Sequence, residues 1–495
     1  MKTLRDYQLR GIEMLRDSLR RGKRRPVLQL PTGAGKTLLS AALIDRALAK
    51  GQRCIFTVPR ISLVDQTVDA FLRQGVSQVG VIQQAHEMTD RSRPVQVASI
   101  DSLMRRDIPP AGLVIVDEAH LQRDFLYEWM RRSEWQRVPF IGLSATPWTK
   151  GMAKHWDDLV VVSTTEKMIE AGYLSPFRAF APSSPDLTGV GTERGDYVVK
   201  QLSAVMDQPK LVADVVTTWL ERGEDRPTLC FAVDRSHAKH LQQKFQAAGV
   251  PTGYVDAYSK PEDRALLEKQ FRSGEIRVAC SVGVLTTGVD WDVRCISLAR
   301  PTKSEMLYVQ MIGRGLRPAP GKDHLLLLDH SDSTLRLGFP DQIHHNALDD
   351  GNPRNKADKD RIALPKPCPS CHYLKPPKMA VCPSCGFRAE HGPKAQEVQD
   401  GELIEITAKN PQALTLARKG EIYGQLKAVA RKRGYSSGWA SHKFREMTGV
   451  WPNAVRDAPE RDPDQALLNW IRGRQRAFAK LRGAGHTDNV NSAAV

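Results

Sequence analysis

The sequence of 495 residues contains no apolar run of about 18 residues, which is the length that a membrane-spanning helix needs. Its first six residues (MKTLRD) mix charged and apolar side chains, so the sequence also lacks the apolar core of a signal peptide at this point. We therefore expect a cytoplasmic protein that has no membrane partner.

The sequence also lacks the cysteine pattern of a disulfide framework. Of its eight cysteines, Cys54, Cys230, Cys280 and Cys295 lie in or beside apolar, strand-like runs and are interpreted as small buried residues. The other four are clustered near residue 375 and are treated below. All eight fit a reducing compartment.

Negative charge is in the minority. Lysine and arginine number 72 against 56 acidic residues, which gives a net charge of +16, and the isoelectric point is near 9.5. This balance points to a polyanionic partner, nucleic acid before membrane. The length suggests about three domains, and an apolar content of 41% is enough for well-formed cores.

A glycine-rich segment, residues 30–37 (LPTGAGKT), follows an apolar run and precedes a helix-favouring stretch. Strand, glycine turn and helix in this order form the setting of a phosphate-binding loop. Gly33 and Gly35 let the backbone turn its N–H groups inward, towards the point that the positive end of the helix also faces. Lys36 can reach the β- and γ-phosphates of a nucleoside triphosphate, and the Thr37 hydroxyl can bind Mg²⁺.

Two carboxylates directly follow another apolar run, residues 113–116 (LVIV). Carboxylates at the end of a buried strand are costly unless a cation offsets them, and Mg²⁺ on the nucleotide would do so. We therefore predict that Asp117 belongs to the Mg²⁺ shell and that Glu118 orients the attacking water.

Other polar residues stand close to the expected sites of this part of the chain. Ser144 and Thr146 follow the apolar run 140–143, where their hydroxyls could bond to the turn after residue 116 and sense its state. The amide of Gln8 can both donate and accept, which suits the edge of adenine, although an ordinary surface position is an equal alternative. Five apolar runs separated by helical patterns predict a parallel α/β sheet with its ligand at the carboxyl ends of the strands.

A second α/β pattern starts near residue 211 and has no phosphate-binding loop of its own. It offers Arg314 and Arg317 instead, three residues apart, so that one helical turn can present both guanidinium groups on one face. A solvated basic turn is the ordinary explanation of such a pair. Arginines supplied to the γ-phosphate held by the first unit are the better account, because an arginine finger contributes about 10³ to 10⁵ in rate.

The motifs occur in the order and at the spacing of a known family. They are Tyr7-Gln8, GAGKT (33–37), VPR (58–60), DEAH (117–120), SATP (144–147), TTGVD (286–290) and QMIGRGLR (310–317). This set resembles the superfamily 2 DEAH-box helicases, which have two RecA-like domains. Residues 284–290, 299–322 and 325–330 are similar in particular to RadD-like bacterial DNA helicases.

The resemblance, which covers roughly residues 1–390, implies roles for the matched residues. The implied ATP- and Mg²⁺-binding residues are Gln8, Thr32, Gly33, Ala34, Gly35, Lys36, Thr37, Asp117 and Asp290. The implied catalytic residues are Lys36, Asp117, Glu118, Gln310, Arg314 and Arg317. His120, Ser144 and Thr146 would couple hydrolysis to movement, while Arg60, Ser99 and Thr286 would contact the nucleic-acid backbone.

The clustered cysteines predict a metal site. Cys368, Cys371, Cys382 and Cys385 form two C-P-x-C pairs separated by ten residues, a spacing that matches a tetrahedral structural Zn²⁺ site. Iron in a rubredoxin-like site is the alternative. Four thiolates leave no open position, so we expect no catalysis at this metal.

The C-terminal part is basic, with 16 lysines and arginines against nine acidic residues over 401–495. Its aromatic residues are interleaved with basic ones. Trp439, Phe444 and Trp451 either form the core of a small helical domain or stack on nucleic acid.

Together these features predict an α/β protein with two tandem RecA-like parallel-sheet domains, then a small zinc ribbon and a helical C-terminal module. The expected segments are a RecA-like ATP-binding domain (1–162), a linker (163–210), a RecA-like helicase C-terminal domain (211–335), a second linker (336–365), a four-cysteine zinc ribbon (366–390) and a basic helical domain (401–485).

The resulting hypothesis is an ATP-driven DNA helicase or translocase that acts on single-stranded or branched DNA through backbone contacts. We expect it to serve replication, recombination or repair with protein partners of those processes, and to need ATP, Mg²⁺ and structural Zn²⁺. Two alternatives stay open. One is an RNA helicase, since the DEAH box does not distinguish the two nucleic acids. The other is a non-enzymatic nucleic-acid-binding protein in which ATP is a switch.

Overall fold

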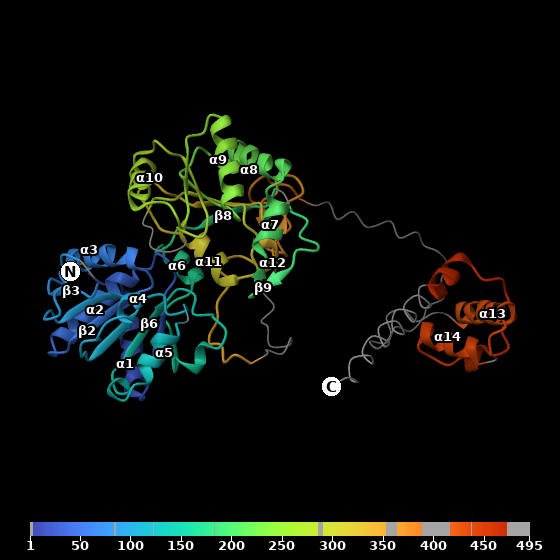
Figure 1. Cartoon of the computed structure of the whole chain (residues 1–495). Helices are drawn as coiled ribbons and strands as arrows, with labels where there is room; N and C mark the ends of the chain where they lie inside the picture. Colours follow the sequence, from blue (N-terminus) through green and yellow to red (C-terminus); the bar gives the residue numbers. More distant parts are fainter. Residues whose placement is uncertain are drawn as a thin grey trace, which may run out of the picture. The chain divides into compact units, whose positions relative to one another are not determined.

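The computed structural model describes residues 3–83, 86–121, 123–182, 184–285, 291–352, 364–388, 416–436 and 438–472. The chain divides into two compact units, Met1–Glu390 and His391–Val495. The first unit contains two lobes, each built on its own parallel sheet (Figure 1). No helix in these ranges is long and apolar enough to cross a membrane.

The first lobe is organised by a seven-stranded parallel sheet with the order β3-β4-β2-β5-β6-β1-β7. Its strands are β1 (Pro26–Gln29), β2 (Cys54–Val58), β3 (Val79–Val81), β4 (Val95–Ser99), β5 (Leu113–Val116), β6 (Phe140–Ser144) and β7 (Asp158–Val161). The five interior strands are those that the apolar runs predict. The two edge strands, of three and four residues, carry too little pattern for the sequence to have indicated them.

Helices cover both faces of this sheet. Successive residues of a strand point to opposite faces, so Val27 and Leu28 of β1 enter different apolar cores. The Leu28 core contains residues of α1 (Asp6–Arg20), α2 (Lys36–Leu48) and α3 (Val64–Arg73), whereas the Val27 core contains residues of α4 (Ile100–Leu103) and α5 (Asp124–Arg131). Short 3₁₀ turns are η1 (Ile61–Leu63), η2 (Ser133–Trp135) and η3 (Met152–Lys154).

The second lobe has a six-stranded parallel sheet with the order β12-β13-β11-β14-β15-β8. Its strands are β8 (Phe177–Phe180), β11 (Thr228–Phe231), β12 (Thr252–Val255), β13 (Val278–Ser281), β14 (Cys295–Leu298) and β15 (Leu325–Asp329). Its helices are α8 (Pro209–Arg222), α9 (Arg235–Ala247), α10 (Pro261–Ser273), α11 (Glu305–Gly313) and α12 (Ser333–Leu337). The prediction of two parallel-sheet α/β domains is confirmed.

The stretch 163–210, which we expected to be a linker, contains regular structure. It includes α6 (Thr165–Glu170), edge strand β8, a hairpin of β9 (Thr192–Glu193) and β10 (Asp196–Tyr197), and α7 (Val199–Met206). The prolines and glycines between these elements weaken any periodic pattern, and the strands are too short to restore one.

The cysteine cluster packs against the second lobe. A two-stranded hairpin, β16 (Lys366–Pro367) and β17 (Leu374–Lys375), leads into the cluster. Tyr373 forms an antiparallel bridge with Phe180 of β8, and the Ala181 N–H donates to the His372 carbonyl at 3.1 Å. The cluster therefore lies on the edge of the second sheet.

The C-terminal unit is helical where it is described, over 416–436 and 438–472. It contains α13 (Leu416–Lys432), α14 (Trp439–Thr448) and the 3₁₀ turn η4 (Pro452–Val455). Phe444 is only 1% exposed and belongs to its core, Trp439 packs against that core, and Trp451 is 42% exposed.

Candidate active site

The phosphate-binding loop connects β1 to α2, as the sequence predicted. Gly33 and Gly35 have φ angles of 87° and 78°, which lie in the left-handed region that glycine adopts without steric cost. Lys36 is the first residue of α2, and none of the described side chains caps the helix N-terminus. The first N–H groups of α2 are therefore available to an anion.

Lys36 lies deep in this loop, and its Nζ donates to the Leu30 carbonyl at 3.4 Å. Burial lowers the pKa of Lys36, while the nearby Glu118 and Asp117 carboxylates act in the opposite direction. A partly buried ammonium beside two carboxylates is the electrostatic arrangement expected where a cation meets a polyphosphate.

The carboxylates follow β5. Asp117 donates its backbone N–H to the Thr57 carbonyl at 2.9 Å, and Glu118 has a φ of 48°. That left-handed conformation costs a non-glycine residue about 1–2 kcal/mol, and such strain often marks a functional site.

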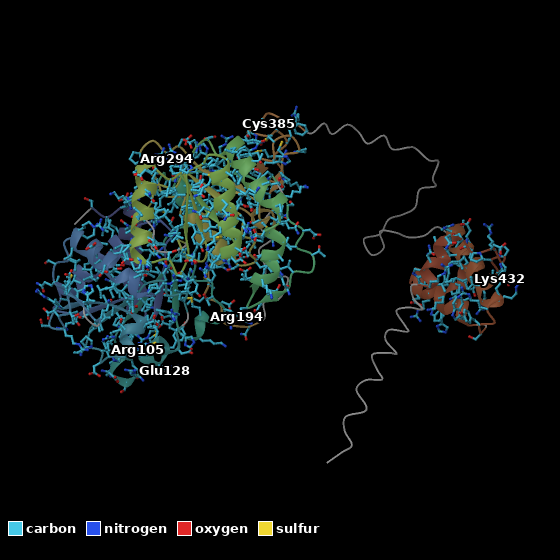
Figure 2. All side chains as sticks on the ribbon, turned by 45° about the horizontal axis from the view of Figure 1, so that its top comes forward. Arg105, Glu128, Arg194, Arg294, Cys385 and Lys432 are labelled. Atoms are coloured by element: carbon cyan, nitrogen blue, oxygen red, sulfur yellow. The ribbon has the colours of Figure 1, made fainter. Side chains whose placement is uncertain are left out.

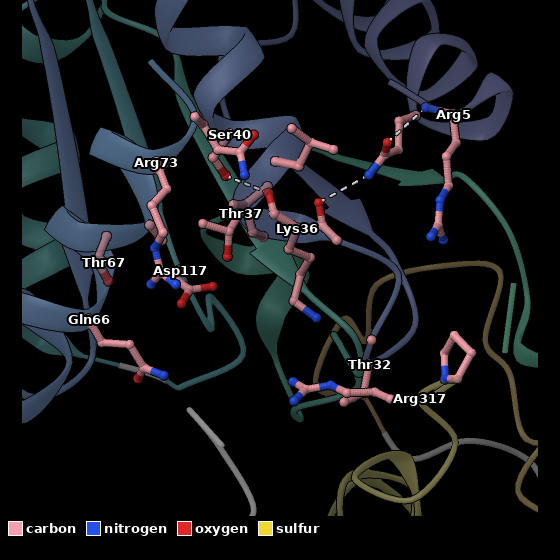
Figure 3. Close-up of a pocket in the computed structure, with 18 of the residues that line it drawn as sticks. Arg5, Thr32, Lys36, Thr37, Ser40, Gln66, Thr67, Arg73, Asp117 and Arg317 are labelled. Atoms are coloured by element: carbon pink, nitrogen blue, oxygen red, sulfur yellow. Dashed lines mark hydrogen bonds between the residues drawn. The ribbon is translucent and has the colours of Figure 1, made fainter. Parts of the chain in front are cut away.

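Burial and the neighbouring Glu118 carboxylate raise the pKa of Asp117 to about 7, although Lys36 opposes them. A further cation would favour the ionised form of Asp117. With the Thr37 hydroxyl close by in the cavity (Figure 3), the donor set consists of hard oxygen atoms and fits Mg²⁺.

A hydrogen-bond network joins the DEAH turn to the second lobe. The His120 Nδ1 lies 2.9 Å from Ser144 Oγ and 3.4 Å from Glu118 Oε2. From α11, Gln310 Nε2 donates to Thr146 Oγ1 at 2.9 Å and to His120 Nε2 at 3.1 Å. Burial lowers the pKa of His120, in keeping with a neutral imidazole whose Nε2 accepts from the amide.

The arginines of the second lobe press against the loop of the first. A Cβ atom added to Gly33 would lie 2.9 Å from Arg317 Cγ, and one added to Gly313 would lie 2.7 Å from Thr32 Cβ. Arg314 is 5% exposed, and both Arg314 and Arg317 contribute to lowering the pKa of Lys36. The structure therefore brings both arginines to the predicted nucleotide site.

Residues of both lobes enclose one cavity of about 910 Å³. In Figure 3 the side chains of Lys36, from the first lobe, and Arg317, from the second, extend into the same space, with Asp117 beside it. A volume of this size suits a nucleotide. Trp291 and Asp292 also line the cavity, and no motif in the sequence had indicated them.

Gln8 has a structural partner for each end of its amide. Its Nε2 donates to the carbonyls of Gly35 (3.2 Å) and Ala34 (3.3 Å), and its Oε1 accepts the Arg5 N–H at 3.0 Å. Tyr7 Oη also donates to the Ala34 carbonyl at 2.9 Å. Gln8 thus braces the loop from α1 and lines the cavity, and its contact with adenine stays a prediction.

The structure describes two of the three residues that were predicted to contact nucleic acid. Arg60 is exposed immediately before η1. Ser99 is fully buried, and its hydroxyl caps α4 by accepting the Ser102 N–H at 3.1 Å. Thr286 lies outside the described residues, and so does Asp290, which was predicted to bind ATP. The roles proposed for these residues stay predictions.

The four cysteines of the zinc prediction come together. Their sulfur atoms all lie within 4.8 Å of one another, with 3.7 Å between Cys368 and Cys385 and 3.6 Å between Cys371 and Cys382. A tetrahedral site with Zn–S bonds of about 2.3 Å requires sulfurs about 3.8 Å apart, so the cluster fits Zn²⁺. Cys385, labelled in Figure 2, is the exposed member.

Two family models match the two lobes. Residues 1–149 match the model described as type III restriction enzyme, res subunit, and residues 208–319 match the helicase conserved C-terminal domain. The chain belongs to the superfamily 2 helicases. The nucleotide site described above therefore lies between the two lobes of a helicase-family ATPase.

Several curated proteins are similar to this superfamily 2 chain. A 51.5 kDa protein of a Lactococcus phage (isolate 7-9) is 26% identical over 407 residues, which are 81% of this chain and 86% of that protein. The Saccharomyces cerevisiae protein IRC3, named as an ATP-dependent helicase, is 29% identical over 351 residues, 66% of this chain and 51% of IRC3. The chain therefore spans about half of the yeast protein.

A restriction enzyme is also similar. The type I restriction enzyme EcoKI endonuclease subunit of Escherichia coli is 23% identical over 393 residues, 64% of this chain and 33% of that subunit. Among solved structures, the type ISP restriction-modification enzyme LlaBIII bound to DNA aligns with a TM-score of 0.49 and 15% identity, over 66% of this chain and 28% of that one.

Proposed function

We propose that this chain is an ATP-dependent DNA helicase or translocase, in which ATP hydrolysis between the lobes drives movement on DNA. The observation that carries the proposal is the composite cavity. Lys36 and the carboxylates of the first lobe share it with Arg314 and Arg317 of the second. A pocket whose two halves belong to two lobes can couple a chemical step to a change in lobe position.

The residues of the cavity support a mechanism of hydrolysis. The loop N–H groups and the Lys36 ammonium would bind the phosphates, and Glu118 would orient the attacking water. Thr37 and Asp117 would hold Mg²⁺, which when bound neutralises phosphate charge. Arg314 and Arg317 would stabilise the charge that develops on the γ-phosphate oxygens in the transition state.

The network around His120 would report the state of the nucleotide to the second lobe. Glu118 contacts the His120 imidazole, which in turn accepts from Gln310 of α11. A shift of the Glu118 carboxylate on hydrolysis would disturb this bond and the neighbouring bond from Gln310 to Thr146. Loss of the two bonds would let the lobes separate.

DNA is the substrate that we infer, in single-stranded or branched form and in replication, recombination or repair. The similarity to RadD-like DNA helicases over residues 284–330 supports DNA, and so does the presence of a restriction endonuclease subunit among the relatives. The net charge of +16 favours a polyanion of either kind.

The C-terminal unit supplies a surface suited to single strands. Trp451 is 42% exposed, the Arg445 guanidinium lies 4.7 Å from the centre of its ring, and His442 meets it edge-on at 5.2 Å. An exposed indole beside an arginine can stack on a base while the guanidinium group contacts phosphate. Phe444, which the sequence grouped with Trp451, belongs to the core instead.

The test measures the ATPase rate of the full chain without nucleic acid and with single-stranded DNA, forked DNA, duplex DNA or RNA. We expect DNA to raise the rate more than RNA, and Glu118→Gln to abolish the increase. A Trp451→Ala variant should need about tenfold more single-stranded DNA for half-maximal stimulation, the loss expected from one stacked base, whereas Trp451→Phe should need little more than the parent.

The outcomes separate the alternatives. Preferential stimulation by RNA would replace DNA by RNA as the substrate. Equal and negligible turnover of the parent and Glu118→Gln would indicate a non-enzymatic ATP switch. An ATPase that no nucleic acid stimulates would remove the helicase proposal.

A further inference from the structure

Lys322 is a partly buried cation to which neither the sequence motifs nor the proposed mechanism assigns a role. It lies between α11 and β15, and its Nζ donates to the carbonyl of Val293 at 2.7 Å, to that of Arg317 at 2.7 Å and to that of Gly315. An ammonium group has three N–H donors, so each of them has a carbonyl partner.

Two of these carbonyls belong to the turn that carries the arginines. Helix α11 ends at Gly313, and the residues that follow it have carbonyls without partners in the helix. Lys322 binds the carbonyls of Gly315 and Arg317, and a cation in this position also complements the negative end of α11.

Ser175, next to β8, holds the same turn from the other side. Its N–H donates to the Leu316 carbonyl at 2.8 Å, and its hydroxyl donates to the Arg317 carbonyl at 3.3 Å. All three consecutive carbonyls from Gly315 to Arg317 therefore accept a hydrogen bond from Lys322 or Ser175. The Gly315 backbone is also confined, because an added Cβ would lie 2.4 Å from Leu325 Cδ1.

The third carbonyl links this turn to the wall of the cavity. Val293 follows Trp291 and Asp292, which line the nucleotide cavity. The loop before Lys322 is held at the surface by Arg294, labelled in Figure 2, which donates to the carbonyls of Pro320 (2.8 Å) and Gly321 (3.1 Å). The backbone next to Lys322 is therefore held in place, so that its side chain can keep the Gly315–Arg317 turn in position.

We propose that Lys322 is a positioning residue for ATP hydrolysis: it fixes the Gly315–Arg317 turn so that Arg314 and Arg317 face the triphosphate. The inference rests on the proposed function, since it assumes that the two arginines act on the nucleotide. Lys322 touches neither arginine guanidinium group through these bonds and acts only through the backbone. Three converging carbonyls need three donors, which a neutral side chain of the same length does not supply.

The protonation state of Lys322 provides a second way to test the inference. Burial lowers the pKa of Lys322 to about 8, with Arg294, Arg226 and Arg317 acting in the same direction and Asp292 in the opposite one. A neutral amine has two N–H groups, so loss of the proton leaves one of the three carbonyls without its donor.

Loss of the Lys322 proton takes a donor away from the turn, yet the contribution of Lys322 to the stability of the folded chain rises over the same pH range. The pKa of Lys322 in the folded chain, about 8, lies below its ordinary value of 10.5, so between these values the unfolded chain binds more protons. Stability from this group therefore rises as the pH increases through that window. A rate that falls there does not result from unfolding caused by Lys322.

The experiment compares Lys322→Met and Lys322→Arg with the parent in the full chain, and Lys269→Met on the exposed face of α10 is the matched control. We expect Lys322→Met to lower kcat by about 10- to 100-fold, the cost of a small misplacement of catalytic groups. The KM for ATP should stay within about threefold, and the melting temperature should fall by at most several degrees, since three carbonyls lose their donor. Lys269→Met should match the parent.

The pH profile adds a readout that a purely structural role would not move. The parent rate should fall by about five- to tenfold between pH 7.5 and 9, as the ammonium loses its proton. Lys322→Arg, which stays charged, should recover part of the rate lost in Lys322→Met and should show no such decline. If Lys322→Met does not fold, a Lys322→Arg profile that declines like that of the parent overturns the proposal, and a flat one supports it.

Arg317→Ala separates failure of this inference from failure of the proposed function. If Arg317→Ala loses turnover while Lys322→Met keeps the parent kcat, the positioning role is wrong and the arginine mechanism stands. If Arg317→Ala itself keeps the parent kcat, the arginine mechanism is wrong, and with it the proposal for Lys322.

Discussion

The two lobes of the first unit have the same strand order. Numbered along each sheet's own sequence, with β8 as the first strand of the second lobe, both sheets run 3-4-2-5-6-1, and the first lobe adds β7 beyond its first strand. Strand β8 thus occupies the place that β1 has in the first lobe. The chemistry at the ends of these equivalent strands nevertheless differs.

The segments after β1 and β8 are the clearest contrast. Strand β1 leads into the glycine loop and directly into α2, whereas β8 is followed by Ala181 and Pro182 and then by the β9–β10 hairpin. A proline has no N–H to offer and has a fixed φ, so this turn does not form a cradle of N–H groups. The second lobe keeps the architecture of the first without its phosphate site.

The helix that follows each of these strands also starts differently. Helix α2 begins directly after the loop at Gly35 with its N-terminus open to a ligand, whereas α7 begins only at Val199, beyond the β9–β10 hairpin. Helix α9, which follows β11 and so has the place of α3, is capped by the Asp234 carboxylate, which accepts the His237 N–H at 3.0 Å. This difference is consistent with the proposed division of roles, in which one lobe binds the phosphates and the other supplies Arg314 and Arg317.

The largest expected effect tests the first lobe. Glu118→Gln should lower ATP turnover by about 10⁴-fold, because the amide does not take up a proton from the attacking water, while nucleotide affinity is retained. Lys36→Ala should lose nucleotide binding or turnover. Steady-state hydrolysis and binding of a fluorescent ATP analogue give both numbers.

Glu128→Gln, on the exposed side of α5 (Figure 2), is the matched control and should behave like the parent. Full turnover in Glu118→Gln would contradict the assignment of hydrolysis to the first lobe and would break the proposed division of roles.

The next effect tests the second lobe. Arg317→Ala should lower kcat by about 10³-fold and leave ATP affinity within about threefold, because an arginine finger acts chiefly on the charge of the transition state. The same two measurements apply. Arg194→Ala, at a site with a side chain 93% exposed in the same lobe, is the control. Loss of affinity with unchanged kcat would make Arg317 a binding residue and assign both lobes the same role.

Local patterns explain why much of the site could be predicted from the sequence. The phosphate loop, the carboxylates after β5 and the four cysteines each lie within a few residues of one another, so their spacing alone indicates the chemistry. Contacts between distant residues could not be predicted in this way. Gln310 and His120 are 190 residues apart, and the three carbonyls that Lys322 binds converge only in the folded lobe.

The fold shows the same division between local and distant information. The interior strands of the first sheet are buried apolar runs that the sequence predicts, whereas β3, β7 and β8 lie at edges and are three or four residues long. Edge strands depend on a neighbour rather than on their own pattern. For the same reason the sequence did not indicate that the cysteine cluster packs on β8.

The edges of the two sheets provide the last contrast and the smallest expected effect. Beyond β1 the first sheet continues with β7, while beyond β8 the second sheet meets the cysteine cluster, through Tyr373 and the bond from the Ala181 N–H to His372. Removing the metal with a chelator, or substituting Cys382→Ser, should therefore loosen β8 and leave β7 unchanged.

Since the ion would hold only the small cluster, we expect a modest fall in melting temperature, by several degrees, and a change in basal ATPase of less than about twofold. Hydrogen exchange at Ala181 should accelerate by about tenfold or more while the amides of β7 keep their rates. The parent should contain one zinc per chain, and the chelator should not shift the melting temperature of Cys382→Ser further. If the metal leaves and hydrogen exchange at Ala181 does not change, the cysteine cluster does not protect β8. The second sheet would then have nothing that covers its edge in the way that β7 covers β1.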